Sequence, residues 1–353
     1  MVEFKVIGLM SGTSMDGLDL AYVKFKNGES GWSFEVIHAQ TMSYSSSWLD
    51  ALNAARFLEK QGLAKLNLKY GSYLGSCVQT FLDQYGIRNV DFVASHGHTI
   101  HHNPEAGITV QIGDGPTLSE FIKIPVVNDF RIQDVLLGGQ GAPLVPIGDR
   151  LLFGRYDACL NLGGFSNISF ERDSKRIAFD IGPANIVLNH LVKSKGISYD
   201  QNGDWARSGV LDESLLNQLH NLEYYSRPVP KSLGVEWVED CVYPLFAKKT
   251  DVDSLLRTVV EHSVFQIAKV CKEYGIDSML VTGGGVYNSF FMERLNSLAT
   301  PKIIVPEKVI VEFKEALVFA FLGVLKWKNQ INVLKSVTGA KTDHSSGKIY
   351  IPN

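Results

Sequence analysis

Two stretches of the chain share one pattern: an apolar strand, a turn of glycine and hydroxyl residues, and a second strand. The first covers residues 6–23 and the second covers residues 159–170. A further apolar strand, residues 177–180, follows the second hairpin and ends in Asp180. The hairpins lie about 150 residues apart, the length that one domain usually takes. The pattern therefore predicts two related domains with a nucleotide cleft between them.

The remaining periodicity predicts an α/β fold. Apolar residues keep a helical spacing at residues 48–61, 66–85, 252–274 and 313–327, and short apolar runs predict strands at 32–39, 91–95, 125–131, 278–282 and 303–305. Glycines and prolines at 136–146 predict a crossing between domains, and the loop-rich residues 196–250 predict an insertion or lid. We expect one domain at 1–130 plus 329–353 and the other at 131–328.

The turn of the first hairpin has the residue types that suit a phosphate. Glycines let the backbone approach a ligand, hydroxyls donate hydrogen bonds, and carboxylates hold a divalent cation. The residues concerned are Gly12, Thr13, Ser14, Asp16, Gly17 and Asp19. An ordinary polar hairpin loop is the alternative, because turns use the same residues. Gly283, Gly284 and Gly285 lie between a predicted strand and the helix predicted at 289–298, an arrangement that favours a nucleotide.

Three further sites carry candidate chemistry. Residues 96–102 hold four histidines after a predicted strand, which indicates a metal site, a polar substrate-binding loop that uses His96 and Thr99, or a solvated loop. Arg131 is suited to bind a carboxylate or phosphate, or to form a salt bridge at a domain interface. Glu315 lies in the first turn of a predicted helix, where a surface charge is also favourable.

Composition excludes several classes of protein. The chain of 353 residues has a formal net charge of −3 and no basic run, which argues against a nucleic-acid partner. Its apolar runs fall short of the ~18 residues that span a bilayer, so we expect no membrane segment. The four cysteines form no CxxC pair. A reduced, cytoplasmic protein is the expectation.

Six motifs together resemble the anhydro-N-acetylmuramic acid kinases, in that family's order and over nearly the whole chain. They are the segments 10–19, 138–146, 161–164, 179–185, 282–285 and 337–340. The resemblance implies the sugar kinase/actin/heat-shock-chaperone fold, with two actin-like (ribonuclease H-like) domains, ATP and Mg²⁺. It also implies a homodimer that acts in murein (peptidoglycan) recycling. In that reaction water opens 1,6-anhydro-N-acetylmuramic acid, and the freed 6-oxygen takes the γ-phosphoryl group of ATP.

The resemblance also assigns roles to residues. It makes Asp180 the base that activates water and lets Glu315 and Arg131 contact the sugar. ATP would be held by the first hairpin together with Gly163, Gly164, Asn167 and Gly283–Gly285.

The sequence departs from the family at His98, His101, Ile181, Ala184 and Thr282. A kinase of the same fold that acts on another sugar is therefore an alternative. An ATP-binding actin-like scaffold and a metal hydrolase built on the histidines are others.

Overall fold

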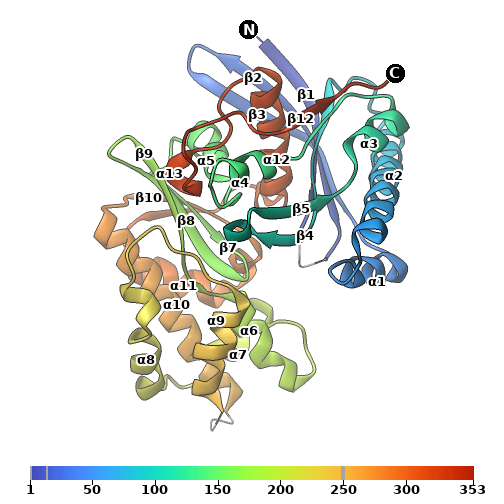
Figure 1. The fold of residues 1–353 in the computed structure, drawn as a ribbon. Coiled ribbons are helices and arrows are strands. Elements are labelled where there is room, and N and C mark those ends of the chain that lie inside the picture. Colours follow the sequence, from blue (N-terminus) through green and yellow to red (C-terminus); the bar gives the residue numbers. More distant parts are fainter. Residues whose placement is uncertain (1, 13–14, 248–250) are drawn as a thin grey trace. The chain divides into compact units, whose positions relative to one another are not determined.

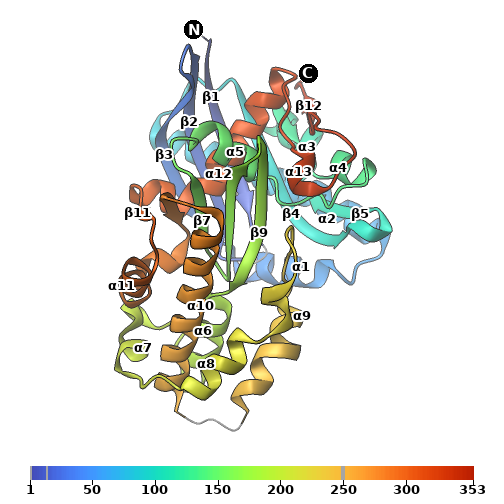
Figure 2. The same cartoon turned by 90° about the vertical axis from the view of Figure 1, so that its left-hand side faces the viewer.

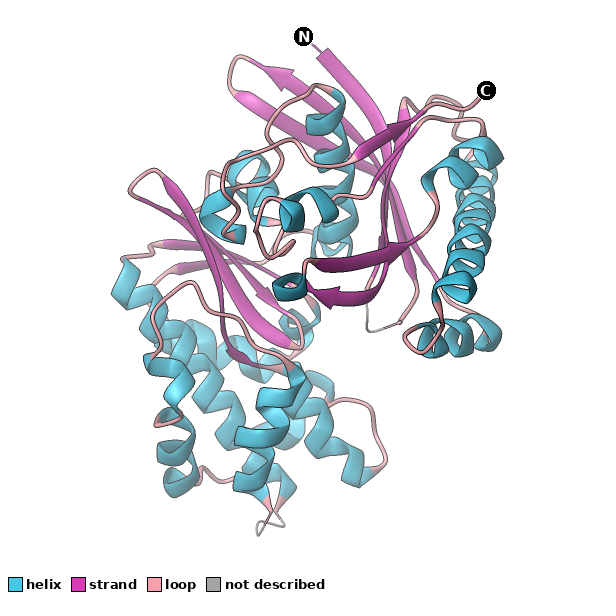
Figure 3. Ribbon diagram, viewed as in Figure 1, coloured by secondary structure: helices cyan, strands magenta, loops and turns pink. Residues whose placement is uncertain are grey.

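The structure is a computed structural model that describes residues 2–12, 15–247 and 251–353. It contains two compact units, one formed by residues 1–152 with 313–353 and the other by residues 153–312. Figure 1 follows the chain through them, and Figure 3 distinguishes their strands from their helices. Among the described residues, no helix combines the length and apolarity needed to cross a bilayer.

The first unit is built on a mixed sheet with the strand order β12-β6-β4-β1-β2-β3 and with β5 paired to β4. Strands β1, β2 and β3 are antiparallel neighbours, whereas β4 runs parallel to β1 and β6 parallel to β4. The strands are β1 (Val2–Ser11), β2 (Leu18–Gly28), β3 (Gly31–Met42), β4 (Phe92–Asn103), β5 (Ile108–Ile112), β6 (Val126–Asn128) and β12 (Lys348–Tyr350).

Helices cover both faces of this sheet. The helices α2 and α12 lie on opposite sides of β1 (Figure 1). Side chains alternate along β1, so Ile7 and Leu9 pack with α2 while Gly8 faces α12. A Cβ on Gly8 would lie 2.0 Å from the Ala316 carbonyl oxygen, so glycine is what lets α12 approach the sheet. The helices are α1 (Ser46–Ala55), α2 (Lys60–Tyr85), α3 (Gly115–Ile122), α4 (Ile132–Leu136), α5 (Pro146–Leu152), α12 (Lys308–Trp327) and α13 (Lys335–Thr338).

The second unit has a five-stranded sheet with the order β11-β10-β7-β8-β9. Its strands are β7 (Ala158–Leu162), β8 (Phe165–Arg172), β9 (Lys175–Pro183), β10 (Ser278–Thr282) and β11 (Lys302–Ile304). The long helix α10 (Val252–Tyr274) contacts β9 and the helices α6, α7, α8 and α11 (Figure 2). The helices around it are α6 (Asn185–Val192), α7 (Asp204–Ser208), α8 (Glu213–His220), α9 (Val235–Trp237) and α11 (Ser289–Leu298).

Short helical turns complete both units. They are 3-10 turns at Pro104–Ala106, Lys193–Lys195, Gln201–Gly203, Glu223–Ser226, Tyr243–Phe246 and Gly284–Tyr287, and a π turn at Val238–Val242. Residues 196–250, predicted to be loop-rich, therefore carry several helices. Leu215, Leu219 and Val238 from this segment belong to the apolar core of the second unit. Burial of these side chains explains why the segment folds onto α10 despite its glycines and prolines.

The two sheets repeat one topology. In each, three antiparallel strands are joined by hairpins, and two more strands run parallel to the first of the three. The order β3-β2-β1-β4-β6 corresponds to β9-β8-β7-β10-β11, which is the ribonuclease H-like arrangement. The predicted α/β fold with two related actin-like domains is confirmed.

The unit boundaries lie at 152/153 and 312/313, whereas the sequence suggested 130/131 and 328/329. The reason is packing of α5 and α12 within the first unit. A buried ion pair of 2.7 Å joins Lys314 Nζ to Asp149 Oδ1, and a Cβ on Gly148 would lie 2.8 Å from the Val318 methyl groups. The segment 136–146 therefore stays inside the first unit.

Replacing Gly8 tests how tightly α12 packs on β1. We expect Gly8→Ala to lower the free energy of unfolding by about 1–3 kcal/mol, because the added methyl overlaps the Ala316 carbonyl. The measurement is equilibrium unfolding in urea. Gly28→Ala is the matched control, since nothing lies within 4 Å of a Cβ there, and it should change stability by less than about 0.5 kcal/mol. Equal stabilities of the two variants would contradict this account.

Candidate active site

The first hairpin turn is only partly described, because Thr13 and Ser14 lie outside the described residues. Gly12 is half-buried, and its carbonyl accepts a hydrogen bond of 3.2 Å from the Met15 N–H. Asp16 is exposed, so its carboxylate is open to a cation or a phosphate-bound metal.

The other two candidates of this turn, Gly17 and Asp19, both contact β3. A Cβ on Gly17 would lie 2.6 Å from Thr41 Cγ2 and 2.8 Å from the Met42 carbonyl oxygen. Asp19 is half-buried, and its Oδ1 accepts a hydrogen bond of 2.5 Å from Thr41 Oγ1. Gly17 is therefore required by the fold, and Asp19 is a carboxylate held in a fixed position.

Below the turn lies a buried chain of polar side chains that the sequence did not reveal. Ser11 Oγ lies 2.6 Å from the Tyr44 hydroxyl and 2.7 Å from His98 Nδ1, and the Tyr44 hydroxyl lies 2.6 Å from that of Tyr70. Desolvation lowers the pKa of His98, so its ring stays neutral. The contacts with His98 and Tyr44 thus anchor Ser11, the last residue of β1 before the turn.

The histidines lie on a strand, so the predicted loop at 96–102 is wrong. β4 continues to Asn103 because residues 98–103 pair with β5. His98 contacts Ser11, His102 Nδ1 lies 3.1 Å from Thr109 Oγ1, and Thr99 accepts a hydrogen bond from the Gln111 amide. In the part of the chain that the structure describes, no group of three or more His, Cys, Asp or Glu side chains is placed to hold a metal ion.

Arg131 fixes the protonation of His96. Its Nε donates to His96 Nε2 at 2.8 Å, and because arginine only donates, Nε2 is the acceptor and Nδ1 carries the proton toward the Gly97 carbonyl at 3.0 Å. Desolvation, reinforced by the charge of Arg131, holds the pKa of His96 well below its ordinary value. Arg131 Nη1 also donates to the Gly141 carbonyl at 2.6 Å. The guanidinium is therefore held at two points.

Arg131 and Glu315 influence each other electrostatically within the first unit. Desolvation lowers the pKa of Arg131 to about 10, against the opposing effects of Glu315 and Asp134. The Glu315 side chain is accessible to solvent, yet desolvation raises its pKa, opposed by Arg131 and reinforced by Asp19. A carboxylate of raised pKa that lies near an arginine and can still be reached by a ligand is the arrangement expected for a polar substrate site.

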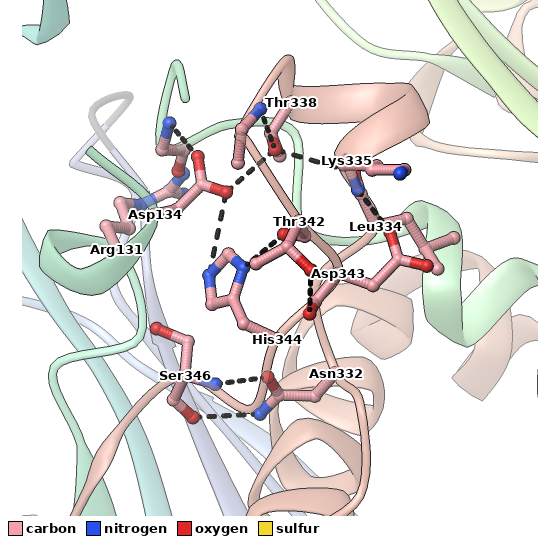
Figure 4. A network of polar contacts seen from close by, with 12 residues as sticks. Arg131, Asp134, Asn332, Leu334, Lys335, Thr338, Thr342, Asp343, His344 and Ser346 are labelled. Carbon is pink, nitrogen blue, oxygen red and sulfur yellow. Dashed lines mark hydrogen bonds and ion pairs between the residues drawn. The ribbon is translucent and has the colours of Figure 1, made fainter. Parts of the chain in front are cut away.

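Asp134 holds the loop that contacts Arg131 (Figure 4). Its carboxylate is fully buried and accepts hydrogen bonds of 2.7 Å from the Gly141 N–H and from Thr338 Oγ1. His344 Nε2 lies 3.6 Å from the same carboxylate. A Cβ on Gly139 would lie 2.2 Å from Asp134 Oδ2, so the glycine allows the loop to close over the carboxylate. The segment 334–346 thereby fixes the position of Gly141 and, through it, of Arg131.

In the second unit, three polar side chains form a row across adjacent strands. Asn161 of β7 pairs with Asn167 of β8, which pairs with Asp180 of β9. Directly paired residues share one face of a sheet, and this face is opposite to the one whose apolar side chains pack with α10. Thr282 of β10 extends the row, and its buried Oγ1 has no hydrogen-bond partner among the described residues.

The Asp180 backbone and carboxylate are fixed by the segment 224–233. Asp180 Oδ2 accepts a hydrogen bond of 2.9 Å from the Leu233 N–H, its N–H donates to the Lys231 carbonyl at 3.0 Å, and its carbonyl accepts from the Tyr224 hydroxyl at 2.6 Å. Desolvation raises the pKa of Asp180, and the Leu233 hydrogen bond opposes that shift. A positioned carboxylate with a raised pKa is suited to accept a proton.

The glycine-rich turns of this unit pack against each other. A Cβ on Gly283, whose φ is +87°, would lie 2.6 Å from Asn161 Oδ1, and one on Gly285 would lie 2.7 Å from Leu162 Cβ. Gly284 has nothing within 4 Å, so its backbone is open to a ligand. At the β7–β8 turn, a Cβ on Gly164 would lie no closer than 3.7 Å to another residue.

Asn185 completes this cluster of turns. Its Nδ2 donates to the carbonyls of Leu162 and Gly163 at 3.2 and 2.9 Å. The second unit thus carries a candidate base on β9, and the turns after β7 and β10 of the same sheet carry two glycines, Gly164 and Gly284, with space beside their backbones.

Comparisons with known proteins agree with this arrangement. A family model described as anhydro-N-acetylmuramic acid kinase matches residues 4–352. An anhydro-N-acetylmuramic acid kinase of Sulfurimonas denitrificans is 33% identical, with 99% of this chain and all of that protein covered. One from Pseudomonas savastanoi is 34% identical, with the same coverage. Among solved structures, the (R)-2-hydroxyglutaryl-CoA dehydratase component A of Acidaminococcus fermentans aligns over 90% of this chain and 96% of its own, at 11% identity and a TM-score of 0.47, too low to support an inference.

The family match covers nearly the whole chain. The chain belongs to the anhydro-N-acetylmuramic acid kinase family.

Proposed function

We propose that the protein uses ATP to open 1,6-anhydro-N-acetylmuramic acid hydrolytically and to phosphorylate its 6-oxygen, in murein recycling. Water adds to the anomeric carbon, and the bond from that carbon to the 6-oxygen breaks. The freed oxygen then bonds to the γ-phosphorus as ADP leaves, which gives N-acetylmuramic acid 6-phosphate. The observation that carries this proposal is the desolvated Asp180 carboxylate, which is held by Leu233 in the row with Asn161 and Asn167.

Asp180 acts as the base that takes a proton from the attacking water. One of its oxygens is fixed by Leu233, whereas Oδ1 forms no hydrogen bond with any residue that the structure describes. A base of raised pKa accepts a proton more readily than an ordinary aspartate, provided it stays ionised at the working pH. The row therefore presents one oxygen for catalysis and uses the other for orientation.

Arg131 and Glu315 contact the sugar. The substrate is itself an acid, and a guanidinium binds a carboxylate through two parallel hydrogen bonds. Arg131 Nε and Nη1 are occupied by His96 and Gly141, which orients the guanidinium before substrate arrives. Both ring nitrogens of His96 are already hydrogen-bonded, so His96 acts on the sugar through Arg131. Thr99, on the same strand, supplies a hydroxyl for the sugar.

The nucleotide-binding candidates of the second unit are the glycine turns at 163–164 and 283–285 and Asn167, and the candidate of the first unit is the first hairpin. Mg²⁺ fits the carboxylates of that hairpin, because Asp16 is exposed and Asp19 is held in place, and hard cations prefer carboxylate oxygens. When bound, Mg²⁺ would neutralise charge on the phosphates. The proposal includes a cytoplasmic location and a homodimer, the oligomeric state that the family resemblance implies.

Asp180→Asn tests the assigned base. We expect kcat to fall about 10²–10⁴-fold, because amide nitrogen and oxygen do not accept the proton. ADP release is measured with 1,6-anhydro-N-acetylmuramic acid and with N-acetylmuramic acid, which has no anhydro bond. The wild type should respond to the anhydro sugar alone. Asp173→Asn removes an exposed carboxylate from the same unit and should leave kcat unchanged.

Two results would argue against the proposal. ADP release with both sugars would favour a kinase that acts without ring opening. Absence of any sugar-dependent ADP release, with ATP-driven assembly instead, would favour a scaffold.

The raised pKa of Asp180 also predicts how stability depends on pH. Its ionised form is disfavoured in the folded state, so its contribution to stability declines as pH rises from the unfolded pKa, about 3.9, through the raised folded pKa. Asp180→Asn should therefore be more stable than the wild type at neutral pH, with a difference that shrinks on acidification. Urea unfolding at several pH values measures this. A difference that is constant with pH would contradict the assignment.

Arg131→Lys tests the sugar contact. Lysine carries the charge but lacks the planar donors that bind His96 and Gly141. We expect KM for the anhydro sugar to rise about tenfold or more, with KM for ATP little changed. Arg56→Lys, an exposed change in the same unit, is the control. An increase in KM for ATP alone would place Arg131 at the nucleotide instead.

A further inference from the structure

A cavity of about 240 Å³ lies in the second unit behind the strand that carries Asp180. Its walls come from β9, α10 and the segment 225–231. Phe179 and Ile181 line it, and because side chains alternate along a strand, they point to the face opposite to the Asp180 carboxylate. The cavity is therefore separate from the row of Asn161, Asn167 and Asp180.

Positive charge dominates the lining. Three basic side chains and one carboxylate line the cavity: Lys231, Lys269 and Arg227, and Glu273. Arg227 is already paired, since its Nε and Nη2 both donate to Glu223 Oε1. Neither lysine forms an ion pair among the residues that the structure describes.

Lys231 is held in place without a counter-ion. Its Nζ donates to the Tyr224 carbonyl at 3.0 Å and lies 4.6 Å from the centre of the Tyr224 ring. Desolvation and then the nearby Lys269 lower the pKa of Lys231, an effect that Glu273 opposes. Two cations that repel each other beside a cavity gain from an anion placed between them.

A buried amide adds a specific hydrogen-bonding group. Gln266 of α10 lines the cavity with 4% of its surface exposed, and its side chain makes no hydrogen bond with any described residue. Polar groups at such positions normally have a protein or water partner, so this amide is available to a polar molecule in the cavity. Phe179, Val229 and Tyr274 supply apolar walls.

The cavity is joined to the proposed base by the main chain. The Lys231 carbonyl accepts the Asp180 N–H, and two residues further on the Leu233 N–H donates to Asp180 Oδ2. A ligand that contacts the Lys231 side chain therefore acts on the segment that positions the catalytic carboxylate.

We propose that this cavity binds a small organic anion, a carboxylate or phosphate monoester with an apolar part, and that its occupancy changes the turnover of the enzyme. Lys231 and Lys269 neutralise the anion, and the Gln266 amide donates to one of its oxygens. The effect on turnover rests on the proposed kinase function, whereas binding itself does not.

Calorimetric titration with phenyl phosphate and with benzoate tests the site. A saturating non-hydrolysable ATP analogue and 1,6-anhydro-N-acetylmuramic acid are present, so that anions enter neither the nucleotide site nor the sugar site. We expect saturable binding of one anion per chain, weakened about tenfold by Lys269→Met and by Gln266→Leu. Lys272→Met removes an exposed lysine of the same helix that does not line the cavity, and it should leave binding unchanged.

Three results would overturn the site. One is equal binding by the Lys269→Met variant, and another is no saturable binding by either anion. The third is equal binding of benzyl alcohol, which would reveal an apolar cavity without charge selectivity. Binding is measured without turnover, so these results stay informative even if the protein proves not to phosphorylate the anhydro sugar.

The second arm measures kcat with both substrates saturating. The anion that binds more tightly should change kcat of the wild type at least twofold, and this response should be lost in Lys269→Met, whose basal kcat stays that of the wild type. Binding without any change in kcat would leave an anion site but refute its effect on turnover.

Discussion

The first unit depends on one buried carboxylate. Asp134 accepts hydrogen bonds from Gly141, in the loop between α4 and α5, and from Thr338, more than 200 residues away. A buried charge is stable only when its oxygens are satisfied, so both segments must close around it. Because the Gly141 carbonyl in turn accepts a hydrogen bond from Arg131, this carboxylate also helps to fix the position of Arg131. Removing one donor would leave an unsatisfied charge, a change that typically costs more than the hydrogen bond itself.

In the second unit, a carboxylate is held in position mainly by backbone groups. Asp180 is oriented by main-chain contacts from the segment 224–233, and its neighbours in the row are amides that carry no charge. Its carboxylate therefore meets little positive charge, and burial dominates its pKa. In the first unit, by contrast, charged groups act on each other, since Glu315 and Asp134 raise the pKa of Arg131 against the effect of desolvation. The second unit carries a carboxylate whose pKa is raised by burial, and the first carries a half-buried arginine with carboxylates near it.

The sequence predicted much of this arrangement, because strands, turns and helices leave local periodic signals. The paired hairpins, the helix at 252–274 and the strand at 278–282 were all read correctly. Contacts such as Ser11 with His98, or Asp134 with Thr338, join side chains far apart in the chain and leave no periodic trace. The polar histidine run looked like a loop because its pairing strand, β5, lies further along the chain. Placing α12 required knowing that Gly8 faces it.

The bond from Arg131 to His96 also determines how the site exchanges protons. His96 stays neutral far below its ordinary pKa, and Arg131 keeps its proton up to a pKa of about 10. The pair therefore carries a single positive charge across the neutral range. An acidic ligand that arrives as a carboxylate meets that charge already in place. Contact with this pair requires no proton uptake, so any dependence of the heat of binding on the ionisation enthalpy of the buffer would come from another group, such as Glu315, whose pKa is raised.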